Sequence, residues 1–200
     1  MLVLASIGLT QPPESIGKVA ALEGKAYVLH QGHTTSEHLA VGSPLYQEDV
    51  IQTEAASKIK LTFVDGTVLN LGENGLLKIS KFVYAPEQKI QSSIFTISHG
   101  VFRAVMANLL PRSRLEVTTH TAVAAIRGTD WMGEVTRDSS AFVALQGRVD
   151  SIYNANPAVH GRVHLNDGWG TTVKVNQSPT RPTKWGEARV NALLKATALP

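Results

Sequence analysis

The sequence predicts an all-β domain of many short strands, with one short helix near the C-terminus. Three observations lead to this prediction. Apolar and polar residues alternate with a period of two in several segments, glycine-containing turn signals separate these segments, and the spacing between turns is irregular. Irregular spacing argues against a long solenoid with a fixed repeat, so we expect a compact single domain, for example a sandwich-like one.

Length and composition are those of one folded domain. The chain has 200 residues, of which 43% are hydrophobic and 18% are charged. Its 19 Lys and Arg residues are scattered singly among 16 Asp and Glu residues, so we expect no nucleic-acid partner. The absence of Cys excludes disulfides, thiolate metal sites and cysteine nucleophiles.

The first segment, Met1–Leu9, is apolar and uncharged. It is far shorter than the roughly 20 residues that span a bilayer, so we expect no membrane span here. Small residues at Ser6 and Gly8 suit a cleavage site, and residues 1–15 are therefore predicted to be the remnant of a secretory signal peptide. An N-terminal strand is the alternative. A signal peptide predicts a protein that is periplasmic or otherwise exported.

The β domain is predicted to occupy residues 16–177. Near its start, residues 17–19 and 24–28 are expected to form a short strand pair. Residues 58–63 alternate strictly, Asp65-Gly66 predicts a tight turn, and the alternation resumes in the return strand from Thr67. This is the strongest hairpin in the sequence.

Further glycine turns are expected at Gly100, Gly147 and Gly168. The segment after Gly100 fits two structures. Helical spacing relates Phe102, Val105, Met106 and Leu109, whereas Val101, Arg103 and Val105 would form one face of a strand. The pattern alone leaves both structures open.

Residues 178–200 are predicted to form a linker and a short helix. The linker, SPTRPT, carries two prolines, and the segment 184–196 that follows it has none. The helix would place Trp185, Ala188, Ala192 and Lys195 along one stripe, with Val190, Leu193 and Leu194 beside it. We expect it to dock on the sheet; the alternative is that Trp185 and Leu193 are offered to a partner.

The order of these features resembles the FecR domain, the periplasmic part of a class of bacterial transmembrane signalling regulators. The matching segments span most of residues 16–175 and are 17–19 with Gly24, 42–53, 57–67, 95–100, 117–129, and Gly147 with Val149. The positions that carry the family signature are Asp65, Gly66, Thr67, Gly100, Arg127, Gly128, Thr129 and Gly147.

The resemblance implies a compact roll or solenoid-like β fold, a strand at residues 101–105 and no enzymatic activity. In the full-length regulators, such a domain passes a signal from an outer-membrane receptor to a cytoplasmic sigma factor. This sequence shows neither a cytoplasmic anti-sigma segment nor a membrane helix, so we do not expect the polypeptide itself to control a sigma factor. The expected partner is another envelope protein.

The tripeptide at 127–129 lies between two apolar stretches and is expected to be structural. Gly128 would let the chain bend where a side chain is disfavoured. The five donors of the Arg127 guanidinium would satisfy backbone carbonyls or a carboxylate. Candidate carboxylates are Asp65, Glu73 and Asp130. Binding of an anionic ligand by Arg127 is the alternative.

The sequence shows no pattern of catalytic or cofactor-binding residues. It contains no GxSxG motif and no phosphate-binding glycine loop, and Ser98 and His99 would face opposite sides of a strand. His30, His33 and His38 lie close in sequence, and His160 and His164 are four residues apart. Neither group suggests a metal site in a loop or a strand, so no metal and no cofactor are expected.

We therefore expect a non-enzymatic module that binds another protein or transduces a signal in the bacterial envelope. A module that binds glycan or peptidoglycan is the alternative. It would use Trp131, Trp169, Tyr153 or Tyr84 as a stacking platform, although only 6% of the residues are aromatic.

Overall fold

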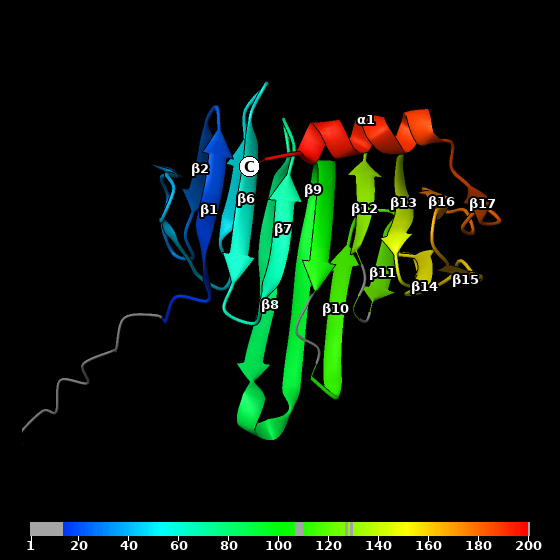
Figure 1. Ribbon diagram of the computed structural model, residues 1–200, viewed down its shortest axis with the longest axis horizontal. Coiled ribbons are helices and arrows are strands. Elements are labelled where there is room, and N and C mark those ends of the chain that lie inside the picture. Colours follow the sequence, from blue (N-terminus) through cyan, green and yellow to red (C-terminus); the bar gives the residue numbers. More distant parts are fainter. Residues whose placement is uncertain (1–13, 107–109, 127, 129, 200) are drawn as a thin grey trace, which may run out of the picture.

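The computed structural model describes residues 14–106, 110–126, 128 and 130–199, and it is an all-β fold with one short helix near the C-terminus. Hydrogen bonds connect the strands into one sheet that forms two layers and does not close into a barrel (Figure 1). The predicted fold class is confirmed. Residues 1–13, most of the predicted signal-peptide remnant, lie outside the described residues.

Layer A contains antiparallel strands, and its centre is the second half of the long strand β9 (Ile90–Met106). On one side of β9 lie β7 (Thr67–Leu71), β6 (Lys58–Phe63), β1 (Gly17–Glu23) and β4 (Pro44–Leu45). On the other side lie β12 (Asp130–Val135), β13 (Ser139–Gln146), β16 (Trp169–Lys174) and β17 (Thr183–Lys184).

Layer B is centred on the first half of β9. On one side lie β8 (Leu76–Ala85), β5 (Val50–Thr53), β2 (Ala26–Leu29) and β3 (Glu37–His38). On the other side lie β10 (Arg112–Thr118), β11 (Ala122–Ile126), β14 (Val149–Asn154) and β15 (Arg162–Leu165). Only the pairing of β9 with β10 is parallel among the pairings described in this layer. A short 3-10 helix, η1 (Pro86–Gln88), connects β8 to β9.

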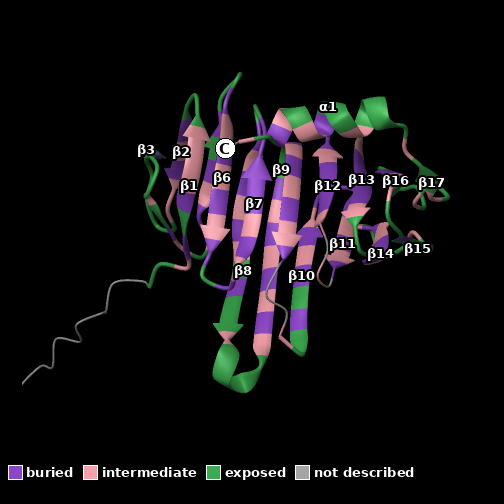
Figure 2. Cartoon of the chain, in the orientation of Figure 1, coloured by how far each residue is buried: buried purple, intermediate pink, exposed green. Residues whose placement is uncertain are grey.

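The hydrophobic core lies between the two layers. Because side chains alternate along a strand, the longer strands turn one apolar row inward, and Figure 2 shows this as alternating buried and less buried residues. Phe63 of layer A packs against Phe82 and Phe95 of layer B, with ring centroids 5.5 and 5.0 Å apart. Apolar area buried here stabilises the fold by about 25 cal/mol per Å².

Strand β9 passes from layer B to layer A at Gly100. Up to His99 it pairs with β8, and from Gly100 onward it pairs with β12. Gly100 has φ +103°, and a Cβ at this position would lie 2.7 Å from the Cα of Gly75. The sequence predicted a turn at Gly100, whereas the chain continues as a bent strand of 17 residues. The strand prediction for residues 101–105 is confirmed and the helical alternative is wrong.

Other glycine turns also carry the chain between layers. The glycines that follow β1, β13 and β15 all have positive φ, and the next strand in each case belongs to the other layer; they are Gly24, Gly147 and Gly168. The predicted pairing of residues 17–19 with 24–28 is therefore wrong, since β1 pairs with β4 and β6. The hairpin around Asp65-Gly66 is confirmed, with Thr62 opposite Val68.

Helix α1 (Glu187–Thr197) packs across the outer face of layer A (Figure 1). Leu193 contacts Met132 and Val143 of the sheet and is 6% exposed. The predicted helix and its docking are confirmed. The buried helix residues are Leu193 and Thr197, whereas the predicted stripe at Ala188 and Ala192 is exposed. The alternative, in which Leu193 is offered to a partner, is wrong.

Candidate functional site

Asp65, the first residue of the family-signature DGT sequence, anchors the turn between β6 and β7. Its side chain is buried, with 1% exposed. One carboxylate oxygen accepts the Thr67 backbone N–H at 2.8 Å, and the other accepts the Gln91 side-chain amide at 3.1 Å. Gln91 lies on β9 in layer B and in turn accepts the Ser113 hydroxyl from β10 at 2.7 Å. This buried hydrogen-bond network connects a turn of layer A to two strands of layer B.

The signature glycines lie at bends of the backbone. Gly66, Gly100, Gly128 and Gly147 all have positive φ, which a side chain disfavours. Arg127 and Thr129 lie outside the described residues, so their structural assignment stays a prediction. Each carboxylate proposed as a partner of Arg127 has another described partner. Asp65 accepts from Gln91, Asp130 from Arg103, and Glu73 from the Ala56 N–H.

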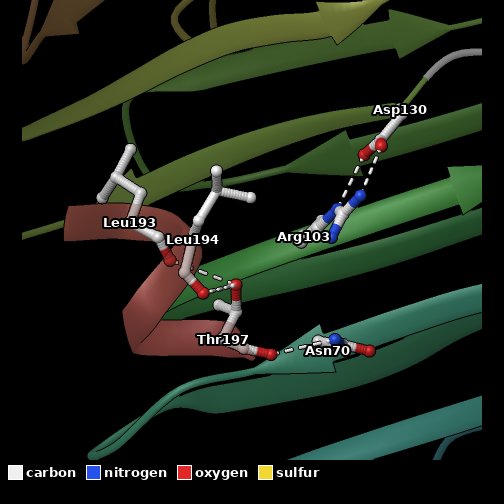
Figure 3. Close-up of polar contacts among 6 residues, drawn as sticks. All are labelled: Asn70, Arg103, Asp130, Leu193, Leu194 and Thr197. Atoms are coloured by element: carbon white, nitrogen blue, oxygen red, sulfur yellow. Dashed lines mark hydrogen bonds and ion pairs between the residues drawn. The ribbon is translucent and has the colours of Figure 1, made fainter. Parts of the chain in front are cut away.

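Arg103 and Asp130 form an ion pair on the outer face of layer A, beside the C-terminal end of α1 (Figure 3). Two parallel hydrogen bonds, from Nε at 2.8 Å and from an amino nitrogen at 2.5 Å, join the guanidinium to the carboxylate. These hydrogen bonds raise the pKa of Arg103 above its ordinary value. Nearby, the Asn70 amide donates to the Thr197 carbonyl at 2.9 Å. The Arg103 and Asp130 charges neutralise each other, and the Asn70 hydrogen bond attaches the end of the helix to the sheet.

Sequence reasoning did not identify the Arg103–Asp130 pair. The two residues are 27 positions apart, and they meet because β9 and β12 are antiparallel neighbours, with Val105 opposite Asp130. Only knowledge that β9 and β12 are neighbouring strands would have identified Arg103 and Asp130 as partners. Arg103 lines an open surface depression with Asn70 and Leu199, and the Arg103–Asp130 pair itself provides no nucleophile.

Two histidines of the group His30, His33 and His38 lie beside carboxylates. His30 Nδ1 lies 2.7 Å from a carboxylate oxygen of the fully buried Asp49, whose other oxygen accepts the Tyr46 N–H at 2.8 Å. His33 lies 3.6 Å from Glu37. In the part of the chain that the structure describes, no three His, Cys, Asp or Glu side chains gather in a way that could hold a metal ion. His164 contacts the Asp150 carbonyl.

The four aromatic residues considered for glycan stacking do not form a platform. Trp131 is fully buried in the core against Phe102. Trp169 is exposed on β16 of layer A, whereas Tyr84 and Tyr153 lie on β8 and β14 of layer B. Trp169 therefore lies in a different layer from Tyr84 and the half-buried Tyr153.

The most prominent free surface is the end of the β8–β9 hairpin. This projecting hairpin, residues 80–95, extends with the start of β10 beyond the other strands, and its tip is largely exposed (Figures 1 and 2). Val83 and Tyr84 are each 37% exposed. In the described part of the chain, β8 pairs with β5 through residues 76–78, so residues 81–85 have a strand neighbour on one side, β9. An unpaired strand edge with apolar side chains is the candidate interaction site.

Comparison with known proteins agrees with this fold. Two crystal structures of a candidate anti-sigma factor from Parabacteroides distasonis ATCC 8503 resemble the chain, with TM-scores of 0.57 and 0.56 and sequence identities of 15% and 16%. Each alignment covers 72% of this chain, and 63% or 64% of the other. This chain thus spans less than two thirds of their length, and at such identities the likeness shows the fold alone.

No curated protein sequence matches the chain. The sequence profile of the family described as FecR protein matches residues 49–150, which is just over half of the chain. The match includes the Asp65 turn, the bend at Gly100 and the glycine after β13. The chain belongs to the FecR protein family.

Proposed function

We propose that this chain is a non-enzymatic signalling module that acts in the bacterial periplasm by binding another envelope protein. Membership of the FecR family supports a regulatory role. The observation that carries the binding proposal is the open edge of β8 on the projecting hairpin, beside the exposed Val83 and Tyr84. Unpaired main-chain groups at such an edge can hydrogen-bond to a partner strand, and apolar side chains beside them add buried area.

The rest of the described surface fits a binding role better than a catalytic one. Several charged groups away from the hairpin form ion pairs, such as Arg103–Asp130 and Lys78–Glu48. Within the described residues, no helix has both the length and the apolar character needed to cross a membrane.

Site-specific photo-crosslinking in intact cells tests this function. A benzophenone amino acid would replace Tyr84 on the projecting hairpin or, as a matched control, the exposed Val175 after β16. We expect position 84 to give a discrete adduct with one protein in the periplasmic or membrane fraction, and position 175 to give none. The adduct would be identified by mass spectrometry.

Two outcomes would contradict the proposal. Recovery of the unmodified chain in the cytoplasmic fraction would rule out a periplasmic role. Absence of any protein adduct from position 84 and from a set of probes on the other exposed surfaces would rule out binding to an envelope protein.

A further inference from the structure

We propose that the open edge of β8, from Lys81 to Ala85, pairs with a short extended segment of the partner that carries acidic side chains. This inference rests on the proposed protein-binding function and specifies its site and the chemistry of the partner. Four observations support it: the direction of the backbone groups, the apolar residues beside the edge, the charges around it, and features that limit its length.

The backbone direction follows from one hydrogen bond. The Phe82 N–H donates to the Gln47 side-chain oxygen at 3.1 Å, so it points away from β9. In an antiparallel pair, successive residues direct their N–H and C=O groups alternately toward and away from the neighbouring strand. Tyr84, two residues on, therefore also directs its N–H and C=O outward. Val83 and Ala85 direct theirs toward β9, opposite Ser92 and Ile90.

Apolar side chains lie on both faces of this edge. Phe82 is buried against Phe63, with ring centroids 5.5 Å apart, and Tyr84 follows it on the same face. Val64, next to Phe63 in the β6–β7 turn, is exposed. Val83 lies on the opposite face. A strand added here would therefore find apolar contacts for side chains on each of its own faces.

The charges near the edge are mostly positive. The side chains of Lys81, on the edge, and Lys89, at the hairpin tip, are exposed and have no ion-pair partner among the described residues. Arg112 also has none there, but it lies on β10, on the other side of β9 from the edge. Arg114 pairs with Glu116 at 2.5 Å, and Lys78 pairs with Glu48 at 2.7 Å. Glu87, in η1, is the one exposed acid of the projecting hairpin. Unpaired cations around an open edge favour a partner segment with acidic residues.

Two features limit how much chain can pair. A bulge between Ile79 and Lys81 interrupts the strand on one side, and Pro86 begins η1 on the other. Such features protect edge strands from unrestricted pairing. They leave room for a segment of about five residues, matched to the open stretch of β8. The Gln47 side chain occupies the Phe82 N–H and must be displaced when a partner strand binds.

The test is an NMR titration of the whole isotope-labelled chain with a capped ten-residue peptide in which Val and Glu alternate. We expect saturable shifts of the amide signals of residues 81–85 on addition of the peptide. A peptide in which Val and Lys alternate should bind at least about tenfold more weakly, because it would meet Lys81 and Lys89 with like charge.

Matched variants at Tyr84 distinguish the contribution of its backbone N–H to peptide binding from that of its side chain. Tyr84→Pro removes the outward N–H and leaves the hydrogen bonds to β9 intact, since the Tyr84 N–H does not face β9. It should weaken binding at least about tenfold. Tyr84→Thr keeps the N–H and should bind within about threefold of the unsubstituted chain. Gln47→Ala frees the Phe82 N–H and should tighten binding by about twofold to tenfold.

Thermal unfolding of each variant verifies that it is folded. Absence of peptide binding to the folded parent chain, or binding that survives Tyr84→Pro unchanged, would overturn the inference. The experiments distinguish a wrong binding edge from a wrong function. If only the edge is wrong, a protein adduct would still form from probes on another surface of the molecule, while the peptide would leave residues 81–85 unaffected.

Discussion

Asp65 is a buried carboxylate that is stabilised by hydrogen bonds. Its two oxygens accept from the Thr67 N–H and the Gln91 amide. A buried charge without such donors would cost several kcal/mol, whereas charge-assisted hydrogen bonds offset the loss of hydration. The residue therefore fixes the turn geometry and the contact between layers together.

We predict that Asp65→Ala lowers the free energy of unfolding by about 1–3 kcal/mol, because it leaves the Thr67 N–H and the Gln91 amide without their acceptor. Urea unfolding followed by circular dichroism measures the loss. Asp138→Ala is the matched control, since Asp138 is exposed in a turn of layer A. Equal stability of the two variants would show that the Asp65 network contributes nothing.

At this scale the sequence identified the turn but not its partner. Asp65-Gly66 is a local signal, because an Asp side chain can accept a hydrogen bond from the backbone two residues later. Gln91 lies 26 positions away and reaches Asp65 because the two layers face each other there. The choice of Gln91 from the other polar residues of the chain depends on tertiary structure, which local patterns do not contain.

At the scale of elements, α1 depends on its contact with the sheet. It has 11 residues, its N-cap Gly186 makes no side-chain hydrogen bond, and the buried residues are Leu193 and Thr197. Isolated helices of this length are marginal in water. Packing of Leu193 on Met132 and Val143 therefore supplies much of the stability of the helix.

We predict that Leu193→Ala loosens α1 at a cost of about 2 kcal/mol, since it removes the central apolar contact with layer A. Amides of residues 187–197 should exchange with deuterium faster, and binding of a hydrophobic dye should rise as Met132 and Val143 become accessible. Asn191→Ala, at an exposed position of the same helix, should change neither measurement. A helix that exchanges at the parent rate in Leu193→Ala would refute the prediction.

Strands were easier to predict than their pairing. Alternation in residues 58–63 indicates which side chains face the core. The same pattern would fit a strand in either layer. A positive-φ glycine allows a sharp bend but does not say where the bend leads. Gly66 returns the chain to a neighbouring strand of the same layer, whereas Gly147 sends it to the other layer. The turns at Gly66 and Gly147 have similar local sequences, so the sequence alone does not indicate which layer the next strand joins.

At the scale of the whole molecule, the two layers share one strand. Residues 90–99 of β9 pair in layer B and residues 100–106 pair in layer A. The core between the layers contains side chains from both, including Phe63 and Phe95. Neither layer can separate without disrupting β9, so we expect the described domain to unfold as a unit.

We predict that Gly100→Ala destabilises both layers together. The positive φ costs an alanine about 1 kcal/mol or more, and its Cβ would also lie 2.7 Å from the Cα of Gly75. Gly32→Ala is the control, because Gly32 also has positive φ, but a Cβ added there would have no neighbouring atom within 4 Å. Coincident urea transitions of tryptophan fluorescence and circular dichroism, shifted more by Gly100→Ala than by Gly32→Ala, are expected. Separate transitions would show that the layers are independent.

A strand that belongs to both layers also determines how the molecule bears a mechanical load. Tension applied at the hairpin tip runs along β9, whose neighbours are β8 and β10 in one layer and β7 and β12 in the other. Because the tip joins β8 to β9, the two strands are pulled together, and their extraction requires the hydrogen bonds of β9 to β10, β7 and β12 and those of β8 to β5 to shear. A protein pulled from this end would thus resist extension through hydrogen bonds in both layers instead of peeling open from one edge.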